Sequence, residues 1–165
     1  MHNPRHALTT RGFSMIELVM VMAVVAILAL IAVPTFLDRN VRLQVQEAMA
    51  LADLAKARIA TYYADKNEMP NSNEDAGAPA KEKMVSTLVT GVSIDGGAVT
   101  ITFGNSVNSA IAGKHLTWRP ALVTDTPTTR WEWLCNNRPV PPGMTAMGTN
   151  RTDIPGKWLP IECRS

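Results

Sequence analysis

One uninterrupted apolar run, residues 18–33, constrains the fold of this chain more than any other feature. With the residues up to 37 the apolar stretch reaches about the 20 residues that a helix needs to cross a bilayer, and it ends at the polar Asp38. Arg5 and Arg11 precede it, with no acidic residue among the first twelve. Because positive charge stays on the cytoplasmic side, the chain after the run is expected outside the cytoplasm.

Charge is balanced outside the basic start of the chain. Two of the 16 basic residues, Arg5 and Arg11, lie within residues 1–12, which leaves 14 basic against 14 acidic residues in the remainder. A neutral remainder gives no electrostatic argument for a nucleic-acid-binding face. We therefore interpret the basic start as part of a targeting signal.

A single carboxylate, Glu17, stands at the start of the apolar run. The helix dipole favours an anion in the first turn of a helix. An unpaired acid inside a membrane helix nevertheless costs roughly 2.5–3.5 kcal/mol. Glu17 therefore needs a cationic partner.

The boundary between Gly12 and Phe13 can supply that partner. No A-x-A-like site of an ordinary signal peptide follows the run. A cut after Gly12 would instead remove a leader of residues 1–12, keep the apolar helix, and leave a free amine on Phe13. Glu17 lies four residues further on, on the same helical face. We predict that this amine, from the same chain or from an adjacent copy, neutralises Glu17 and sets the register between staggered copies.

The stretch RGFSMIELVMVMAVVAILALIAVP, residues 11–34, closely resembles the class III signal of type IV pilins and related pseudopilins. In that family a prepilin peptidase cuts after the glycine and methylates the new amine. The resemblance implies cleavage after Gly12 and N-methylation of Phe13. It further implies that Glu17 serves filament assembly and that Pro34 breaks the transmembrane helix.

The resemblance also implies partners and locations. The partners are other pilin subunits in a filament, the prepilin peptidase and the inner-membrane assembly machinery. Before assembly the protein would be a single-pass inner-membrane protein with a periplasmic head, and after assembly it would lie in an extracellular pilus. On this reading residues 13–37 form the transmembrane and filament-core helix, and residues 38–165 form an amphipathic helix that continues into a globular head.

An amphipathic helix is predicted from Asp38 to about residue 67. Apolar and small residues recur there at alternating steps of four and three, as on one helical face. They are Val41, Val45, Ala48, Ala52, Ala55, Ile59 and Tyr62. The helix should end before Pro70, because the residue preceding a proline disfavours helix.

Loop and strand signals fill the rest of the chain. Residues 70–80 read as a loop, residues 81–88 as a short helix, and Asp95-Gly96-Gly97 as a turn. Strands are predicted for residues 98–103, 115–119 and 130–135. Three or four antiparallel strands packed against the helix make a small α+β head.

The two cysteines of the chain, Cys135 and Cys163, show none of the spacings of a zinc or haem site. In a chain with a membrane segment they indicate an oxidising compartment and one disulfide; the alternative is two buried thiols. The tail that contains Cys163, GKWLPIECRS, resembles the end of the disulfide-closed C-terminal loop of many pilins.

The tryptophans admit two interpretations. Together with nearby basic residues they could stack on single-stranded nucleic acid, or they fill the core of the head. The residues concerned are Trp118, Trp131, Trp133 and Trp158, with Arg119, Arg130 and Lys157. Trp131 and Trp133 alternate with Glu132 and so share one face, which favours the core.

Catalysis is not indicated. The three histidines, His2, His6 and His115, are scattered, and we read no metal, cofactor or nucleophile site from the sequence. The favoured function is a structural type IV pilus subunit with a role in adhesion, twitching motility or DNA uptake. The alternatives are a pseudopilin of type II secretion, which usually lacks the disulfide, and a membrane-anchored binding protein acting as a monomer.

Overall fold

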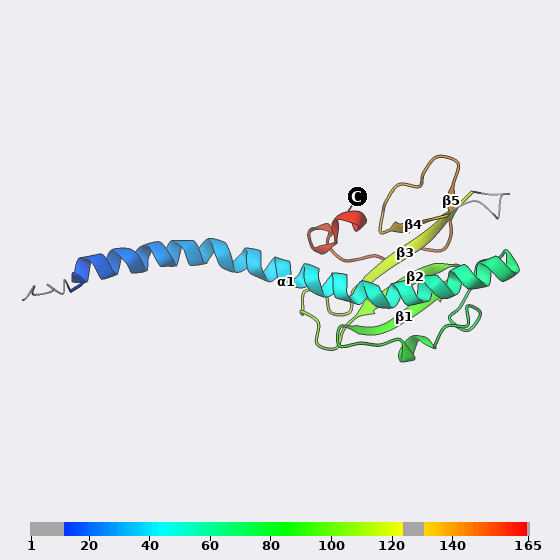
Figure 1. Cartoon of the computed structure of the whole chain (residues 1–165), viewed down its shortest axis with the longest axis horizontal. Helices are drawn as coiled ribbons and strands as arrows, with labels where there is room; N and C mark the ends of the chain where they lie inside the picture. Colours follow the sequence, from blue (N-terminus) through cyan, green and yellow to red (C-terminus); the bar gives the residue numbers. More distant parts are fainter. Residues whose placement is uncertain (1–11, 124–130, 165) are drawn as a thin grey trace, which may run out of the picture. The chain divides into compact units, whose positions relative to one another are not determined.

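The computed structural model describes residues 12–123 and 131–164, and for residues 33–35 it describes the backbone only. The chain divides into two compact units, with the boundary between Leu37 and Asp38. The elements are α1 (Met15–Lys66), β1 (Val89–Asp95), β2 (Ala98–Phe103), β3 (His115–Leu122), β4 (Glu132–Cys135), β5 (Thr145–Ala146) and the short 3₁₀ helices η1 (Lys81–Lys83), η2 (Gly156–Trp158) and η3 (Ile161–Cys163) (Figure 1).

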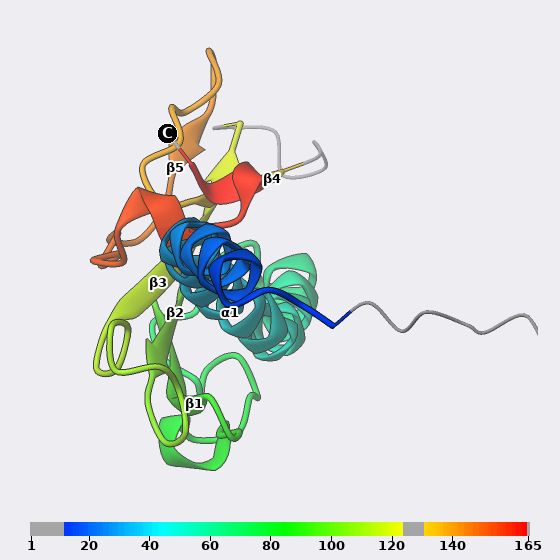
Figure 2. The ribbon, with the colours of Figure 1, turned by 90° about the vertical axis from the view of Figure 1, so that its left-hand side faces the viewer.

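The part of α1 in the second unit lies across one face of the sheet (Figures 1 and 2). Its inner face is the predicted stripe. Six of the seven predicted positions, from Val41 to Ile59, are at most 3% exposed and belong to the core, while Tyr62 is half-buried. The small alanines of the stripe allow the strands to approach the helix closely, so the amphipathic pattern is confirmed.

The helix ends where the sequence predicted. Lys66 is its last residue, and Asn67 has a positive φ of 54°. The Asn67 N–H donates to the Tyr63 carbonyl at 2.8 Å. Asparagine is among the few residues that accept this left-handed conformation, which closes the last turn of a helix.

The sheet is an antiparallel meander in the order β1-β2-β3-β4, and β5 is added to β3. The predicted strand over residues 98–103 is β2. The strand at 115–119 continues to Leu122 as β3, and the strand at 130–135 is β4 from Glu132 onward; residue 130 lies outside the described residues. The predicted α+β class is confirmed.

One segment was predicted wrongly. Residues 81–88 form only the three-residue helix η1, and β1 follows directly, a strand that the sequence analysis missed. Gly91 marks the place where the two segments meet. A Cβ at Gly91 would lie 2.8 Å from the Lys81 side chain, so η1 lies directly over the strand. A glycine within a strand often marks such a close approach.

The outer edge of β1 is covered by the α1–β1 loop, chiefly by Asn73. The Asn73 amide donates to the Val92 carbonyl at 3.0 Å and accepts from the Ile94 N–H at 2.8 Å. It also donates to the Pro79 carbonyl at 2.8 Å, and Asn73 is only 9% exposed. The side chain therefore pairs with β1 as a neighbouring strand would. This pairing protects the edge, because unpaired strand edges invite association with other chains.

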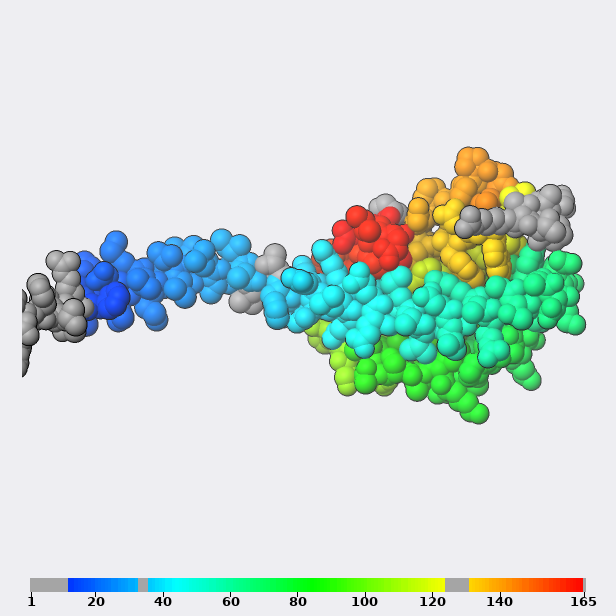
Figure 3. All heavy atoms as spheres, viewed as in Figure 1, coloured from blue at the N-terminus to red at the C-terminus, as the bar shows by residue number. Residues whose placement is uncertain are grey.

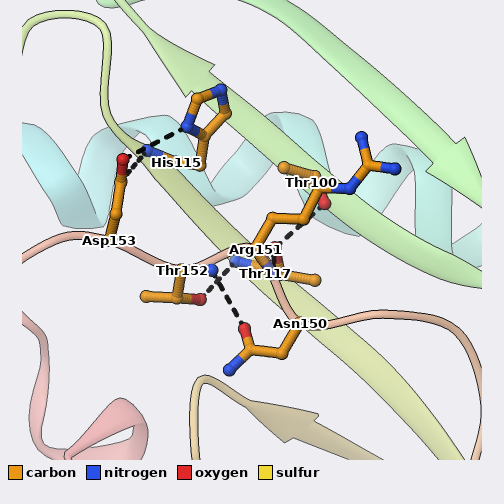
Figure 4. Close-up of polar contacts among 7 residues, drawn as sticks. All are labelled: Thr100, His115, Thr117, Asn150, Arg151, Thr152 and Asp153. Carbon is orange, nitrogen blue, oxygen red and sulfur yellow. Dashed lines mark hydrogen bonds and ion pairs between the residues drawn. The ribbon is translucent and has the colours of Figure 1, made fainter.

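Residues 151–153 of the C-terminal segment, called the strap below, pair with the first residues of β3. The Thr117 N–H donates to Thr152 Oγ1 at 2.9 Å, and the Arg151 N–H donates to Thr117 Oγ1 at 3.1 Å (Figure 4). Asp153 accepts from the His115 N–H at 2.5 Å and donates its own N–H to the His115 carbonyl at 3.2 Å. The strap holds β3 where β4, which pairs with β3 only from Trp118 onward, does not reach.

Candidate assembly site

The helix α1 begins with a local cap that involves Glu17. The Ser14 carbonyl accepts the first bond of the helix from Leu18 at 3.1 Å, so Ser14 is the N-cap residue. The Glu17 carboxylate reaches back to the Ser14 N–H at 3.4 Å. Ser14 and Glu17 have the spacing of a capping box, S-x-x-E. This cap was not predicted above, although S-x-x-E before an apolar run is its ordinary signal.

The capping bond leaves Glu17 available to another partner. A donor–acceptor distance of 3.4 Å is long for an N–H···O bond, and both residues are exposed. A cationic amine would form a shorter and stronger bond with the same carboxylate. Phe13 is 81% exposed, and a Cβ built on Gly12 meets nothing within 4 Å. The junction that we predict to be cleaved is thus open on both sides; residues 1–11 of the leader lie outside the described residues.

The first turns of α1 present an apolar surface. The large apolar side chains between Met15 and Leu37 that the structure describes are 53–83% exposed. The most apolar window of α1 has a mean hydropathy of 3.0, and by length and composition the helix can cross a membrane. An apolar surface of this extent is unfavourable in water, so we expect lipid or other apolar helices to cover it. Position 34 lies within α1, but its side chain is outside the described part, and a helix break at Pro34 remains a prediction.

The disulfide closes the C-terminal region. Cys135 and Cys163 are bonded, with their Cα atoms 4.8 Å apart and a sequence separation of 28. Both are at most 3% exposed. The predicted pairing is confirmed, and it joins the end of β4 to η3.

A polar cluster at the start of the second unit was not predicted. The Asp38 carboxylate accepts from Trp158 Nε1 at 2.8 Å and from Lys157 Nζ at 3.3 Å. These two hydrogen bonds, the one from Trp158 first, lower the pKa of Asp38. The partners are far apart in sequence, and no local pattern announces them.

The tryptophans pack as the alternating pattern indicated. Trp118 is 3% exposed, and Trp131, Trp133 and Trp158 are half-buried against the core. Lys56 Nζ lies 4.6 Å from the centre of the Trp118 ring, so this ring makes a cation–π contact within the head. Within the described residues, no group of three or more His, Cys, Asp or Glu side chains is arranged to hold a metal ion.

Comparison with known proteins identifies the family. A family model described as pilin, a bacterial filament protein, matches residues 41–164, and a model of the prokaryotic N-terminal methylation motif matches residues 9–33. The chain belongs to the pilin family. Over 93% of its length this pilin is 34% identical to a fimbrial protein of Neisseria meningitidis, of which it covers 94%.

Two further relatives agree. The pilin is 35% identical over 93% of its length to a type IV major pilin protein of Neisseria gonorrhoeae, covering 87% of it. It is 31% identical over 94% of its length to the fimbrial protein EcpC of Eikenella corrodens, covering 91% of it. The pilin is accordingly a structural subunit of a type IV pilus and not an enzyme.

Proposed function

We propose that this pilin is cleaved after Gly12 and methylated on Phe13 before its helix enters a filament. The match of the N-terminal methylation motif to residues 9–33 carries the proposal. The open surroundings of Gly12 and Phe13 support it, since a peptidase must reach both sides of the bond. Before assembly, the exposed apolar turns lie in the inner membrane and the head lies in the periplasm; after assembly, the head is extracellular.

The new amine of Phe13 takes over the carboxylate of Glu17. In the described part of the precursor that carboxylate accepts the long bond from the Ser14 N–H. Pairing with the amine of a neighbouring copy neutralises both charges inside the apolar core of the filament. A buried pair of this kind specifies register, because any other stagger leaves two charges unpaired. Prepilin peptidase and the inner-membrane assembly machinery are the further partners.

The names of the relatives favour a pilus over a secretion pseudopilin. Those names include fimbrial proteins and type IV major pilins. Adhesion, twitching motility and DNA uptake use the same N-terminal helix, so the head surface would distinguish among them. A subunit that appears in filaments sheared from the cell surface fits the proposal, whereas one confined to the membrane fraction fits a monomeric anchor.

The processing step has a direct test. The intact mass and the N-terminal sequence of the purified protein should show a chain that begins with N-methylated Phe13. Gly12→Val should retain residues 1–12, because a branched side chain at the cut crowds the peptidase. Gly156→Ala is the matched control: its added Cβ also meets nothing within 4 Å, and cleavage should be normal. A mature chain that keeps Met1 would contradict the proposal.

A further inference from the structure

The C-terminal tail holds the first turns of α1 in the head. Its helix η2 lies beside the start of this part of α1 (Figures 1 and 3). Trp158 and Lys157 both donate to one oxygen of Asp38, and Arg42 Nε donates to the Lys157 carbonyl at 2.6 Å. Asp38 and Arg42 are four residues apart, so they share one helical face. The tail thus binds two successive turns of the helix at once.

The contact is organised around a charge. Lys157 Nζ also lies 4.5 Å from the centre of the Trp158 ring, which aligns both donors on the Asp38 carboxylate. The carboxylate is 41% exposed and the Lys157 side chain 55% exposed. Hydrogen bonds to an ionised acceptor are the stronger kind. The cluster therefore contributes more than an ordinary surface ion pair of the same exposure.

The other end of the tail is fixed to the sheet. Leu159 and Cys163 are both 0% exposed, and Cys163 is bonded to Cys135 at the end of β4. The Asn136 amide donates to the Cys163 carbonyl at 3.1 Å. Leu159 and Cys163 follow closely in the chain after Lys157 and Trp158, which contact Asp38. Loosening the disulfide end should therefore loosen the contact with Asp38.

The part of α1 that precedes this contact contains a residue without a backbone N–H. A proline at position 34 has no N–H to donate to the carbonyl four residues earlier, so the backbone ladder is interrupted there. Segments with few tertiary contacts open locally at a low free energy, so contacts on the next turn matter. Asp38 begins the second compact unit and comes one turn after the proline.

We propose that the tail from Gly156 to Cys163 is a clamp that stops local opening of α1 at Asp38, and that the Cys135–Cys163 disulfide keeps this clamp closed. The clamp rests on contacts within the head alone. It does not depend on the processing or assembly that we propose above, so each can fail without the other.

Amide hydrogen exchange of the full chain in detergent micelles tests the clamp. Trp158→Phe keeps an aromatic ring but loses the indole N–H. Exchange in peptides covering residues 38–48 should become about tenfold faster or more, as expected from losing one hydrogen bond to a charged acceptor. Arg151→Gln is the matched control. It removes the 2.7 Å ion pair with Asp95 at the end of β1, which does not involve Asp38, and should leave those peptides unchanged.

Reduction of the disulfide tests the second half of the proposal. In the wild type, reduction should accelerate exchange over residues 38–48; in Trp158→Phe it should add little there, because both changes act through one contact. Unchanged exchange of residues 38–48 in Trp158→Phe would overturn the clamp. Equal acceleration in peptides of β2 and β3 would overturn it too, since Trp158 would then stabilise the head as a whole. Fully additive effects would overturn the link to the disulfide.

Discussion

Two acidic residues of α1 differ in how their charge is neutralised. The Asp38 carboxylate accepts hydrogen bonds from Trp158 and Lys157 of its own chain. Among the described residues, the hydrogen-bond partner of the Glu17 carboxylate is the N–H of Ser14, at 3.4 Å. A carboxylate with fixed donors is a structural element of the monomer. One held by a single long bond remains free to form a stronger pair elsewhere.

Glu17→Ala should insert into the membrane and be cleaved normally but should fail to assemble. The substitution removes the carboxylate together with its desolvation cost, so the inserted monomer loses little. In the filament the amine of Phe13 is left unpaired, at roughly 3–5 kcal/mol for each subunit. Glu17→Gln keeps the shape without the charge and should fail likewise. The measurement is the yield of sheared filaments relative to subunit in the membrane fraction; normal yields for both variants would show that the carboxylate does not set the register.

Asp38 should make the head sensitive to acid. Its hydrogen bonds lower the pKa of its carboxyl below the ordinary value of 3.8. The stabilisation is therefore complete above that value and is lost as the pH falls through the lower pKa of the folded state. We expect Asp38→Asn to be less stable than the wild type at pH 6, and the difference to shrink below about pH 3.8. Urea unfolding at several pH values measures it; a difference that is independent of pH would contradict the assignment.

At the scale of elements, the head consists of one helix face and a meander whose first edge is closed by a loop. The stripe of α1 covers the sheet, and Asn73 pairs with the backbone of β1 at Val92 and Ile94. Asn73 is one of the few buried polar residues in the described part of the chain. Its position explains why a polar loop residue is buried there.

Asn73→Ala should destabilise the head by about 2–4 kcal/mol, because the Ile94 N–H and the Val92 carbonyl each lose a partner. Asn71→Ala is the matched control: Asn71 is exposed in the same loop, and surface substitutions of this kind change stability by about 0.5 kcal/mol or less. Urea unfolding followed by tryptophan fluorescence compares the two. Equal stability of both variants would mean that the loop, and not the Asn73 side chain, protects the strand edge.

At the scale of the whole molecule, the chain joins a segment that is stable only in an apolar environment to a head that is stable in water. The head depends on its tail, which pairs with β3 through Thr152 and is bonded to β4 through Cys163. The tail contains little regular structure of its own. Its order comes from the strap, the disulfide and the contact with Asp38.

Cys163→Ser should lower the stability of the head by about 2–5 kcal/mol, the usual effect of removing a disulfide from a small secreted domain. The amount of subunit should fall, while leader cleavage stays normal because the junction lies far away in sequence. Ile161→Ser is the matched control. Ile161 lies in the same short helix but is 83% exposed, so this substitution should change the stability of the head little. Thiol labelling of unreduced, unfolded wild-type protein should find no free thiol; labelling of both cysteines would refute the bridge.

The sequence by itself determined what depends on near neighbours along the chain. The apolar run, the offset from Phe13 to Glu17, and the inner stripe of α1 are periodic or local patterns, and they predicted the helix, its buried face and the family. With only two cysteines present, Cys135 could pair only with Cys163, but it was the structure that decided between a disulfide and two thiols. The missed strand β1 is the partial exception: Gly91 was visible, but its meaning came from the approach of Lys81.

Only the tertiary structure decided which distant residues meet. Asp38 with Trp158, Asn73 with Val92 and Ile94, and Thr117 with Thr152 are contacts across loops of different lengths. Each polar group had many possible partners in the sequence. The choice was made when the helix stripe and the sheet packed together, because packing placed one partner beside each of these groups. For the buried Asn73 and Thr117, burial also required a hydrogen-bond partner.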